Sequence, residues 1–160
     1  MTKKKKIVYV TLQADIVHKG HINILKTAFL YGDVYVGLLT DEAIVTYDYL
    51  PYLDYDKRKV IVENLKYVKK VIPQKTLDYT ENLNLIRPDY VVHGDDWKTG
   101  IQKKTRERVI KQLKKWSGRL LEPKYTKNIS STLIKKKMNI IATVPENRVS
   151  RLKRLINSKN

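Results

Sequence analysis

The stretch IVYVTLQADIVHKGH, residues 7–21, decides the fold of this 160-residue chain. Residues 7–12 form an apolar, β-branched run of strand length, and residues 22–31 show the apolar pattern of a helix. A strand that passes through a tight turn into a helix leaves backbone N–H groups and the positive end of the helix dipole at that turn. The stretch therefore predicts a phosphate site at the end of the first strand.

Two histidines, His18 and His21, bracket the turn. Both imidazoles can donate hydrogen bonds to phosphate oxygens that gain charge as a bond to phosphorus breaks. Gly20 lies between them, and we expect its missing side chain to leave room for a nucleotide. A His-x-x-His pattern alone is weak evidence, because two solvated loop histidines explain it better when no other motif follows.

Strand and helix patterns alternate outward from this stretch up to about residue 138. Strands are predicted at 7–12, 34–39, 68–72, 88–93 and 118–122, and helices at 22–31, 54–68, 79–86, 102–116 and 130–138. The apolar helix positions are Val60, Ile61 and Leu65 in 54–68, and the buried face of 102–116 is expected to hold Val109, Ile110, Leu113 and Trp116. Such alternation predicts an α/β fold, a Rossmann-like parallel sheet flanked by helices, with ligands at the carboxyl ends of the strands.

Three motifs in chain order resemble those of the HxGH nucleotidyltransferase superfamily. The first is DIVHKGH at 15–21, the second is YVVHGDDW at 90–97, and the third is YTKNISST at 125–132. The second and third are similar to the GDDW and RTxGIST segments of glycerol-3-phosphate-type cytidylyltransferases. The chain also resembles the cytidylyltransferase domain at the N-terminus of bifunctional phosphoenolpyruvate mutases. Because the motifs span nearly the whole chain, the resemblance is specific.

The resemblance implies transfer of CMP from CTP to an oxygen of a phosphate or phosphonate, with release of pyrophosphate. Both substrates are anions, so the protein has to hold them in line and neutralise the charge on the leaving oxygens. The acceptor implied is a small phosphonate of the 2-hydroxyethylphosphonate or 2-aminoethylphosphonate type, with glycerol-3-phosphate or another phosphoalcohol as the alternative. Mg²⁺ is expected beside CTP.

The resemblance also assigns roles to single residues. The catalytic positions it implies are His18, His21, Arg58 and Lys66; the nucleotide-binding ones are Leu12, Gln13, Ala14, Asp15, Gly20, Gly94, Asp95, Ser130, Ser131 and Thr132; the acceptor-binding ones are Asp96, Trp97 and Tyr125. Asp15 would orient the loop or bind a metal, unless it is a simple turn carboxylate. The serines are suited to capping a helix as well as to holding phosphate, and Trp97 is as well explained by core packing.

Three positions depart from the family pattern. Asp48 stands where related enzymes carry a lysine that neutralises phosphate, while Tyr125 and Lys66 stand where they carry arginines. A carboxylate facing a triphosphate repels it, so we expect Asp48 to slow turnover and Asp48→Lys to raise activity with CTP. The substitution leaves a second interpretation open, a catalytically weakened nucleotide-binding scaffold.

Composition limits the other functions. The formal net charge is +17, which favours anionic partners, but the lysines are scattered and no nucleic-acid-binding module is recognisable, so we rank nucleic acid last. The chain has no cysteine, and a zinc site of three protein ligands would use most of His18, His21 and His93. No apolar run approaches the roughly 20 residues of a membrane span, which leads us to expect a cytoplasmic protein.

The alternation of strand and helix patterns ends near the C-terminus. We expect one nucleotide-binding domain at 1–138 and a basic tail at 139–160, in which 142–147 is a connection and 148–156 a short amphipathic helix. That helix is too small to fold alone and should dock on the domain or a partner. It resembles the entry to a mutase domain, which suggests a fragment of a longer polypeptide; a stop codon after Asn160 would count against this. The family also leads us to expect a homodimer.

Overall fold

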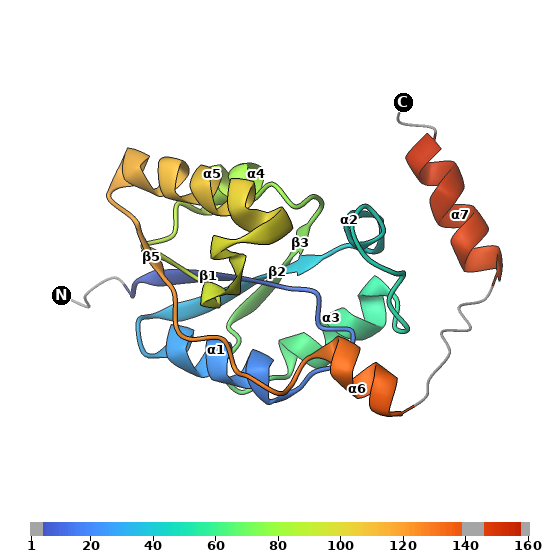
Figure 1. Cartoon of the computed structure of the whole chain (residues 1–160). Helices are drawn as coiled ribbons and strands as arrows, with labels where there is room; N and C mark the ends of the chain where they lie inside the picture. Colours follow the sequence, from blue (N-terminus) through green and yellow to red (C-terminus); the bar gives the residue numbers. More distant parts are fainter. Residues whose placement is uncertain (1–4, 139–145, 158–160) are drawn as a thin grey trace.

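The computed structural model describes residues 5–138 and 146–157 (Figure 1). Within these residues five parallel strands form one sheet in the order β3-β2-β1-β4-β5. The strands are β1 (Ile7–Leu12), β2 (Asp33–Leu39), β3 (Lys70–Gln74), β4 (Tyr90–Val92) and β5 (Arg119–Leu121). The Rossmann-like parallel sheet predicted from the sequence is confirmed.

Helices cover both faces of the sheet. The helices of the described residues are α1 (Lys19–Phe29), α2 (Asp41–Ile44), α3 (Tyr55–Glu63), α4 (Thr80–Ile86), α5 (Lys103–Leu113), α6 (Ser131–Lys137) and α7 (Glu146–Asn157). Three short 3-10 turns accompany them: η1 (Asp95–Lys98), η2 (Gly100–Gln102) and η3 (Lys114–Trp116). Figure 1 shows α1 and α3 on one face and α4 and α5 on the other.

The two-residue period of β1 explains how one strand serves both faces. Val8 and Val10 pack into the core that contains Leu25 of α1, whereas Tyr9 between them packs into the core that contains Leu83 of α4. Alternating side chains of a strand point to opposite faces of a sheet, so a strand covered on both sides is apolar throughout. The continuous apolar run 7–12 reflects this double burial.

The strand order reverses between β1 and β4: β2 and β3 are added on one side of β1, and β4 and β5 on the other. β1 and β4 are neighbours, and they pair Val8 with Tyr90 and Tyr9 with Val91. The chain leaves β1 for α1 on one face and leaves β4 for α5 on the other (Figure 1). The diverging connections open a crevice there, which is where ligands bind in such sheets.

Several element boundaries differ from the expected ones. Helix α1 begins at Lys19, so His21 lies inside its first turn. Pro73 lies within β3, paired with Leu38, although we expected it to end the strand. β3 is an edge strand, where the missing N–H of proline disturbs no pairing on the outer side. The four-residue α2 is too short to leave a periodic signal and was not anticipated.

Helix α3 differs most from its expected form. It ends at Glu63 rather than at residue 68, and Val60 and Ile61 are exposed to solvent by 60% and 40%. The face that turns inward instead carries Arg58 and Val62, both 0% exposed. The apolar pair therefore misled the prediction about this helix, because a buried arginine needs partners that only the tertiary fold supplies.

The tail contains the expected helix. α7 covers residues 146–157 and contacts α2, and its Leu152 is buried. The connection expected at 142–147 lies mostly outside the described residues. None of the helices in the described part of the chain has the length and apolarity that crossing a bilayer would require.

Candidate active site

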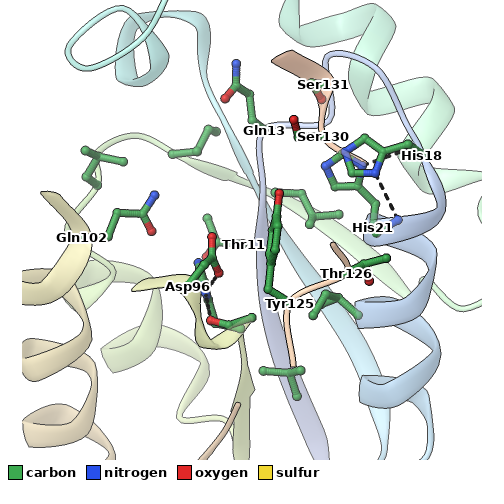
Figure 2. A pocket seen from close by; sticks show the side chains of 18 of the residues that line it. Thr11, Gln13, His18, His21, Asp96, Gln102, Tyr125, Thr126, Ser130 and Ser131 are labelled. Carbon is green, nitrogen blue, oxygen red and sulfur yellow. Dashed lines mark hydrogen bonds and ion pairs between the residues drawn. The ribbon is translucent and has the colours of Figure 1, made fainter. Parts of the chain in front are cut away.

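A cavity of about 290 Å³ opens at the carboxyl ends of β1 and β4 (Figure 2). The expected site residues that line it are Leu12, Gln13, His18, Gly20, His21, Gly94, Asp96, Tyr125, Ser130 and Ser131. In Figure 2, His18 and His21 lie on one side and Asp96 and Gln102 on the other. The fold thus gathers segments from all three sequence motifs around one cavity.

The two imidazoles cap helix α1. His18 is the N-cap, and its Nδ1 accepts a hydrogen bond from the Gly20 N–H at 3.1 Å, while His21 Nδ1 accepts from the His18 N–H at 3.3 Å. The ring centroids lie 4.0 Å apart. Because each Nδ1 acts as an acceptor, each neutral ring carries its proton on Nε2. Both rings can therefore offer an Nε2–H donor to a bound oxygen.

Burial keeps both rings neutral. It lowers the pKa of His21 to about 4, with a further contribution from the charge of His18, and it also lowers the pKa of His18. A polyphosphate bound beside them would favour the protonated rings and raise both pKa values. The pair is therefore suited to stabilising negative charge as it develops, because it gains charge when an anion is present.

Gly20 is required by His18. A Cβ atom at this position would lie 2.8 Å from His18 Cε1 and 3.0 Å from its Nδ1. Such contacts would push the ring away from the N–H group that it caps. The structure therefore gives glycine a role in placing the imidazole, beside the expected approach of a nucleotide.

The hydroxyl-rich segment is tied to the loop after β1. Ser130 caps α6, its Oγ accepting from the Leu133 N–H at 3.1 Å, and Ser131 Oγ donates to the Ile16 carbonyl at 3.2 Å. The capping expected of the serines is confirmed for Ser130, and both serines also line the cavity. Thr132 is exposed and lies outside the lining, so the structure does not support its assignment to the nucleotide site.

Arg58 is buried beside the cavity and does not line it. Its guanidinium donates to the carbonyl oxygens of Gln13 at 2.6 Å, Leu39 at 2.8 Å and Leu53 at 3.1 Å, and to Asp41 Oδ1 at 2.8 Å. Four of its five N–H groups are thus used, and the side chain is 0% exposed. These donors bind three backbone carbonyls and Asp41, so the structure gives Arg58, which was expected to be catalytic, a role in holding the chain beside the cavity.

Lys66 lies at the opposite edge of the sheet. It is exposed in the turn between α3 and β3, where its Nζ lies 6.0 Å from the Tyr67 ring centroid. This turn leads into the amino end of β3, whereas the cavity is at the carboxyl ends. The structure therefore places Lys66, which was expected to be catalytic, away from the cavity of its own chain.

Asp15 and Ala14 shape the loop rather than the cavity wall. Asp15 Oδ1 accepts from the Leu53 N–H at 3.1 Å, and Oδ2 lies 2.5 Å from Lys135 Nζ of α6. Of the two roles expected for Asp15, these contacts favour orienting the loop over binding a metal. Ala14 is buried with a φ of 54°, a left-handed conformation that is uncommon outside glycine and marks a strained turn.

Trp97 and Asp95 serve the scaffold. Trp97 is 1% exposed, its indole N–H donates to Glu122 Oε1 at 2.7 Å, and it does not line the cavity. Of the two interpretations of Trp97, acceptor binding and core packing, these observations favour core packing. Asp95 Oδ1 accepts from the Tyr125 N–H at 2.8 Å, and Asp95 lies outside the cavity lining. Asp95 therefore holds the segment after β5 that carries Tyr125.

His93 is a cavity residue that the motif comparison missed. Its ring stacks on Trp97 with centroids 3.9 Å apart, and its Nδ1 lies 2.8 Å from the Gly94 carbonyl oxygen. Burial lowers the pKa of His93. Its place at the carboxyl end of β4 was the signal that could have found it. Other lining residues not anticipated are Thr11, Ile24, Leu39, Tyr47, Leu77, Tyr79, Val92, Gln102 and Thr126.

The cavity wall carries little charge. Among the described residues that line it, none is lysine or arginine, and Asp96 is the carboxylate. Asp48 is exposed just outside it and accepts from the Tyr49 N–H at 2.7 Å. The described residues hold no group of three or more histidine and carboxylate side chains that could bind a metal ion. The expected Mg²⁺ would therefore depend on phosphate oxygens with at most Asp96 beside it, a common arrangement for this ion.

Comparisons with known proteins find relatives by sequence and by fold. A glycerol-3-phosphate cytidylyltransferase of Bacillus spizizenii is 34% identical over 139 residues, covering 84% of this chain and 97% of the relative. An ethanolamine-phosphate cytidylyltransferase of Mus musculus is 33% identical over 120 residues, covering 74% of this chain but only 29% of the relative. A lipopolysaccharide core biosynthesis protein from Thermoplasma volcanium shares the fold, with a TM-score of 0.63 at 22% identity over 78% of this chain and 99% of that one.

The family profile described as Cytidylyltransferase-like matches residues 13–137, which contain the imidazole pair, the cavity residues after β4 and the two serines at the start of α6. The match covers well over half of the chain. The chain therefore belongs to the cytidylyltransferase-like family and is a nucleotidyltransferase enzyme.

Proposed function

We propose that this protein transfers CMP from CTP to a small phosphonate of the 2-hydroxyethylphosphonate or 2-aminoethylphosphonate type and releases pyrophosphate. The observation that carries the transferase part is the convergence of His18, His21 and the α6 serines on one cavity. The Nε2–H donors would stabilise charge on the phosphate oxygens during transfer. The cavity needs no nucleophilic side chain, because the acceptor oxygen attacks the α-phosphorus itself.

The phosphonate rests on the resemblance of the motifs to mutase-linked enzymes, including Tyr125 where other members carry arginine. Tyr125 lines the cavity and is 43% exposed, so it can contact an acceptor. Glycerol-3-phosphate is the second candidate, favoured by the Bacillus relatives named for that substrate. The third is a weakened nucleotide-binding scaffold, favoured by Asp48 and by the lack of lysine or arginine on the described cavity wall.

One assay separates these candidates. Pyrophosphate release is measured with CTP, ATP or GTP and each of 2-hydroxyethylphosphonate, 2-aminoethylphosphonate, glycerol-3-phosphate and phosphoethanolamine. Release with CTP and a phosphonate at a kcat/KM at least tenfold above the phosphate esters supports the proposal. A preference for a phosphate ester rejects the phosphonate, and thermal stabilisation by CTP without turnover supports the scaffold.

We also propose a homodimer and a mutase domain, fused or associated, as the surroundings of this domain in a cytoplasmic enzyme. A dimer would offer the one route by which the distant Lys66 could approach an active site, that of a second subunit. Sedimentation equilibrium tests the dimer, and the sequence of the source gene tests the fusion.

A further inference from the structure

Helix α7 lies beyond the family match, which ends at residue 137, yet polar contacts join it to the domain. Arg148 donates from Nη2 to Asp41 Oδ2 at 2.7 Å and from Nη1 to the carbonyl oxygens of Pro51 at 3.0 Å and Tyr52 at 3.2 Å. Leu152, one turn further on, is 7% exposed. The tail therefore has a polar and an apolar anchor on the domain.

Asp41 connects Arg148 to the loop after β1 by also bonding Arg58. Its Oδ2 faces Arg148, and its Oδ1 lies 2.8 Å from Arg58 Nη2. Arg58 in turn donates from Nη1 to the carbonyl of Gln13, a residue that lines the cavity. Asp41 is 8% exposed, so these charge-assisted bonds are shielded from water and are stronger than surface ion pairs.

A second branch reaches the same loop. The segment 51–53 accepts from Arg148 at Pro51 and Tyr52, and its Leu53 N–H donates to Asp15 Oδ1 at 3.1 Å. The loop after β1 is therefore held at Gln13 through Asp41 and Arg58, and at Asp15 through the 51–53 segment. Both branches start at the guanidinium of Arg148.

We propose that Arg148 is a positioning residue for the nucleotide-binding loop, acting through Asp41 and Arg58 on Gln13. The inference rests on the proposed function only in that this loop binds CTP. Without Arg148 the loop samples more conformations, and binding has to order it at a cost in affinity. The tail thus belongs to the active-site scaffold, although it lies outside the shared domain.

The test compares variants of the full chain. Arg148→Met removes the anchor, Arg148→Lys keeps the charge but cannot reach all three acceptors at once, and Arg154→Met removes the same charge from the same helix. Arg154 donates to Ser150 of its own helix, which makes it a matched control. CTP dissociation constants are measured by calorimetry without acceptor, together with KM for CTP and kcat.

We expect Arg148→Met to weaken CTP binding roughly 2- to 30-fold, the range that residues along such networks produce. The CTP affinity of Arg148→Lys should lie between those of the parent and Arg148→Met, and that of Arg154→Met should match the parent. In Arg148→Met the KM for CTP should rise by a larger factor than kcat falls. Equal affinities in Arg148→Met and Arg154→Met would overturn the proposal. If the parent itself binds no CTP, the proposed function fails instead. Hydrogen exchange at the amides of 13–15 then decides: faster exchange in Arg148→Met or Arg148→Lys than in Arg154→Met supports the coupling, and equal exchange rejects it.

Discussion

Two pairs of basic side chains, one on the cavity wall and one behind the loop after β1, are used in opposite ways. The imidazole pair, His18 and His21, lines the cavity and has its Nδ1 atoms bound to backbone, which leaves the Nε2–H groups for a ligand. The arginine pair, Arg58 and Arg148, has its donors bound to carbonyls and to Asp41. What separates a ligand-binding group from a scaffold group here is which donors remain free.

The imidazole and arginine pairs also differ in the free energy that their burial costs. A neutral imidazole costs little to bury and can take up a proton when an anion arrives. A guanidinium remains charged, so its burial requires a partner for nearly every N–H. Arg58 meets this requirement with three carbonyls and one carboxylate, and it thereby fixes the loops from which those carbonyls come.

The largest effect we expect is from Arg58→Met. The change removes the Arg58 donors of Asp41 Oδ1 and of three carbonyls, although Asp41 Oδ2 keeps Arg148. Breaking a buried pair of this kind costs roughly 3–5 kcal/mol of folding free energy. Urea unfolding measures the loss, with Lys59→Met on the same helix as the control, since exposed pairs such as Lys59 with Glu63 contribute only about 0–1 kcal/mol. An Arg58→Met protein as stable as the parent would break the comparison, because the buried donors of Arg58 would then contribute nothing to the scaffold.

The next effect concerns the imidazole pair. His21→Ala removes an Nε2–H donor aimed at the cavity, and loss of one such donor lowers kcat by about 10²–10³-fold. Steady-state pyrophosphate release measures it, with Lys26→Ala on the outside of α1 as the control. We expect CTP affinity to change much less than kcat. An unchanged kcat would place His21 among the scaffold residues.

The sequence was sufficient for the imidazole pair and insufficient for Arg58, for a physical reason. The strand 7–12, the turn and the first helix are neighbours in the chain, so local pattern places His18 and His21 correctly at the carboxyl edge. Arg58 is placed by the nearby carbonyl of Leu53 and by those of Gln13 and Leu39, which lie 45 and 19 residues away in the chain, and no local pattern contains the two distant ones. In α3 the exposed Val60 and Ile61 pointed to the wrong face.

The same distinction explains the segment after β4. The motif at 90–97 indicated the right stretch, but it could not show which of its side chains turn toward the cavity. Strand and turn geometry send His93 and Asp96 to the lining and Trp97 to the core, where the ring of His93 stacks on it. Single-residue roles within a correct motif therefore depend on packing across the sheet.

A smaller effect should appear in the pH dependence of stability. The folded pKa of His21 is lowered to about 4, mainly by burial, whereas the unfolded chain has a value near 6.5. Between these values the unfolded chain binds more protons, so the free energy of unfolding falls as the pH drops from about 6.5 toward 4, by at most about 1.4 kcal/mol per pH unit for one group. His21→Asn should show a shallower fall in urea titrations at pH 7, 6 and 5. An identical slope in both proteins would mean that His21 is solvated when folded.

The smallest effect we expect is from Asp48→Lys. Asp48 is exposed next to Tyr47, which lines the cavity, and burial together with the charge of Asp48 raises the pKa of Tyr47. Exchanging a negative for a positive charge near the triphosphate should raise kcat/KM for CTP by about fivefold at low salt, and by less at high salt because screening acts on exposed charges. Asp33→Lys is the control, since it makes the same change in net charge at the amino end of β2. A higher kcat/KM in Asp48→Lys but not in Asp33→Lys would mean that a cation at residue 48 acts on the phosphates together with the two imidazoles. Equal kcat/KM values in both variants would leave Asp48 outside the phosphate site.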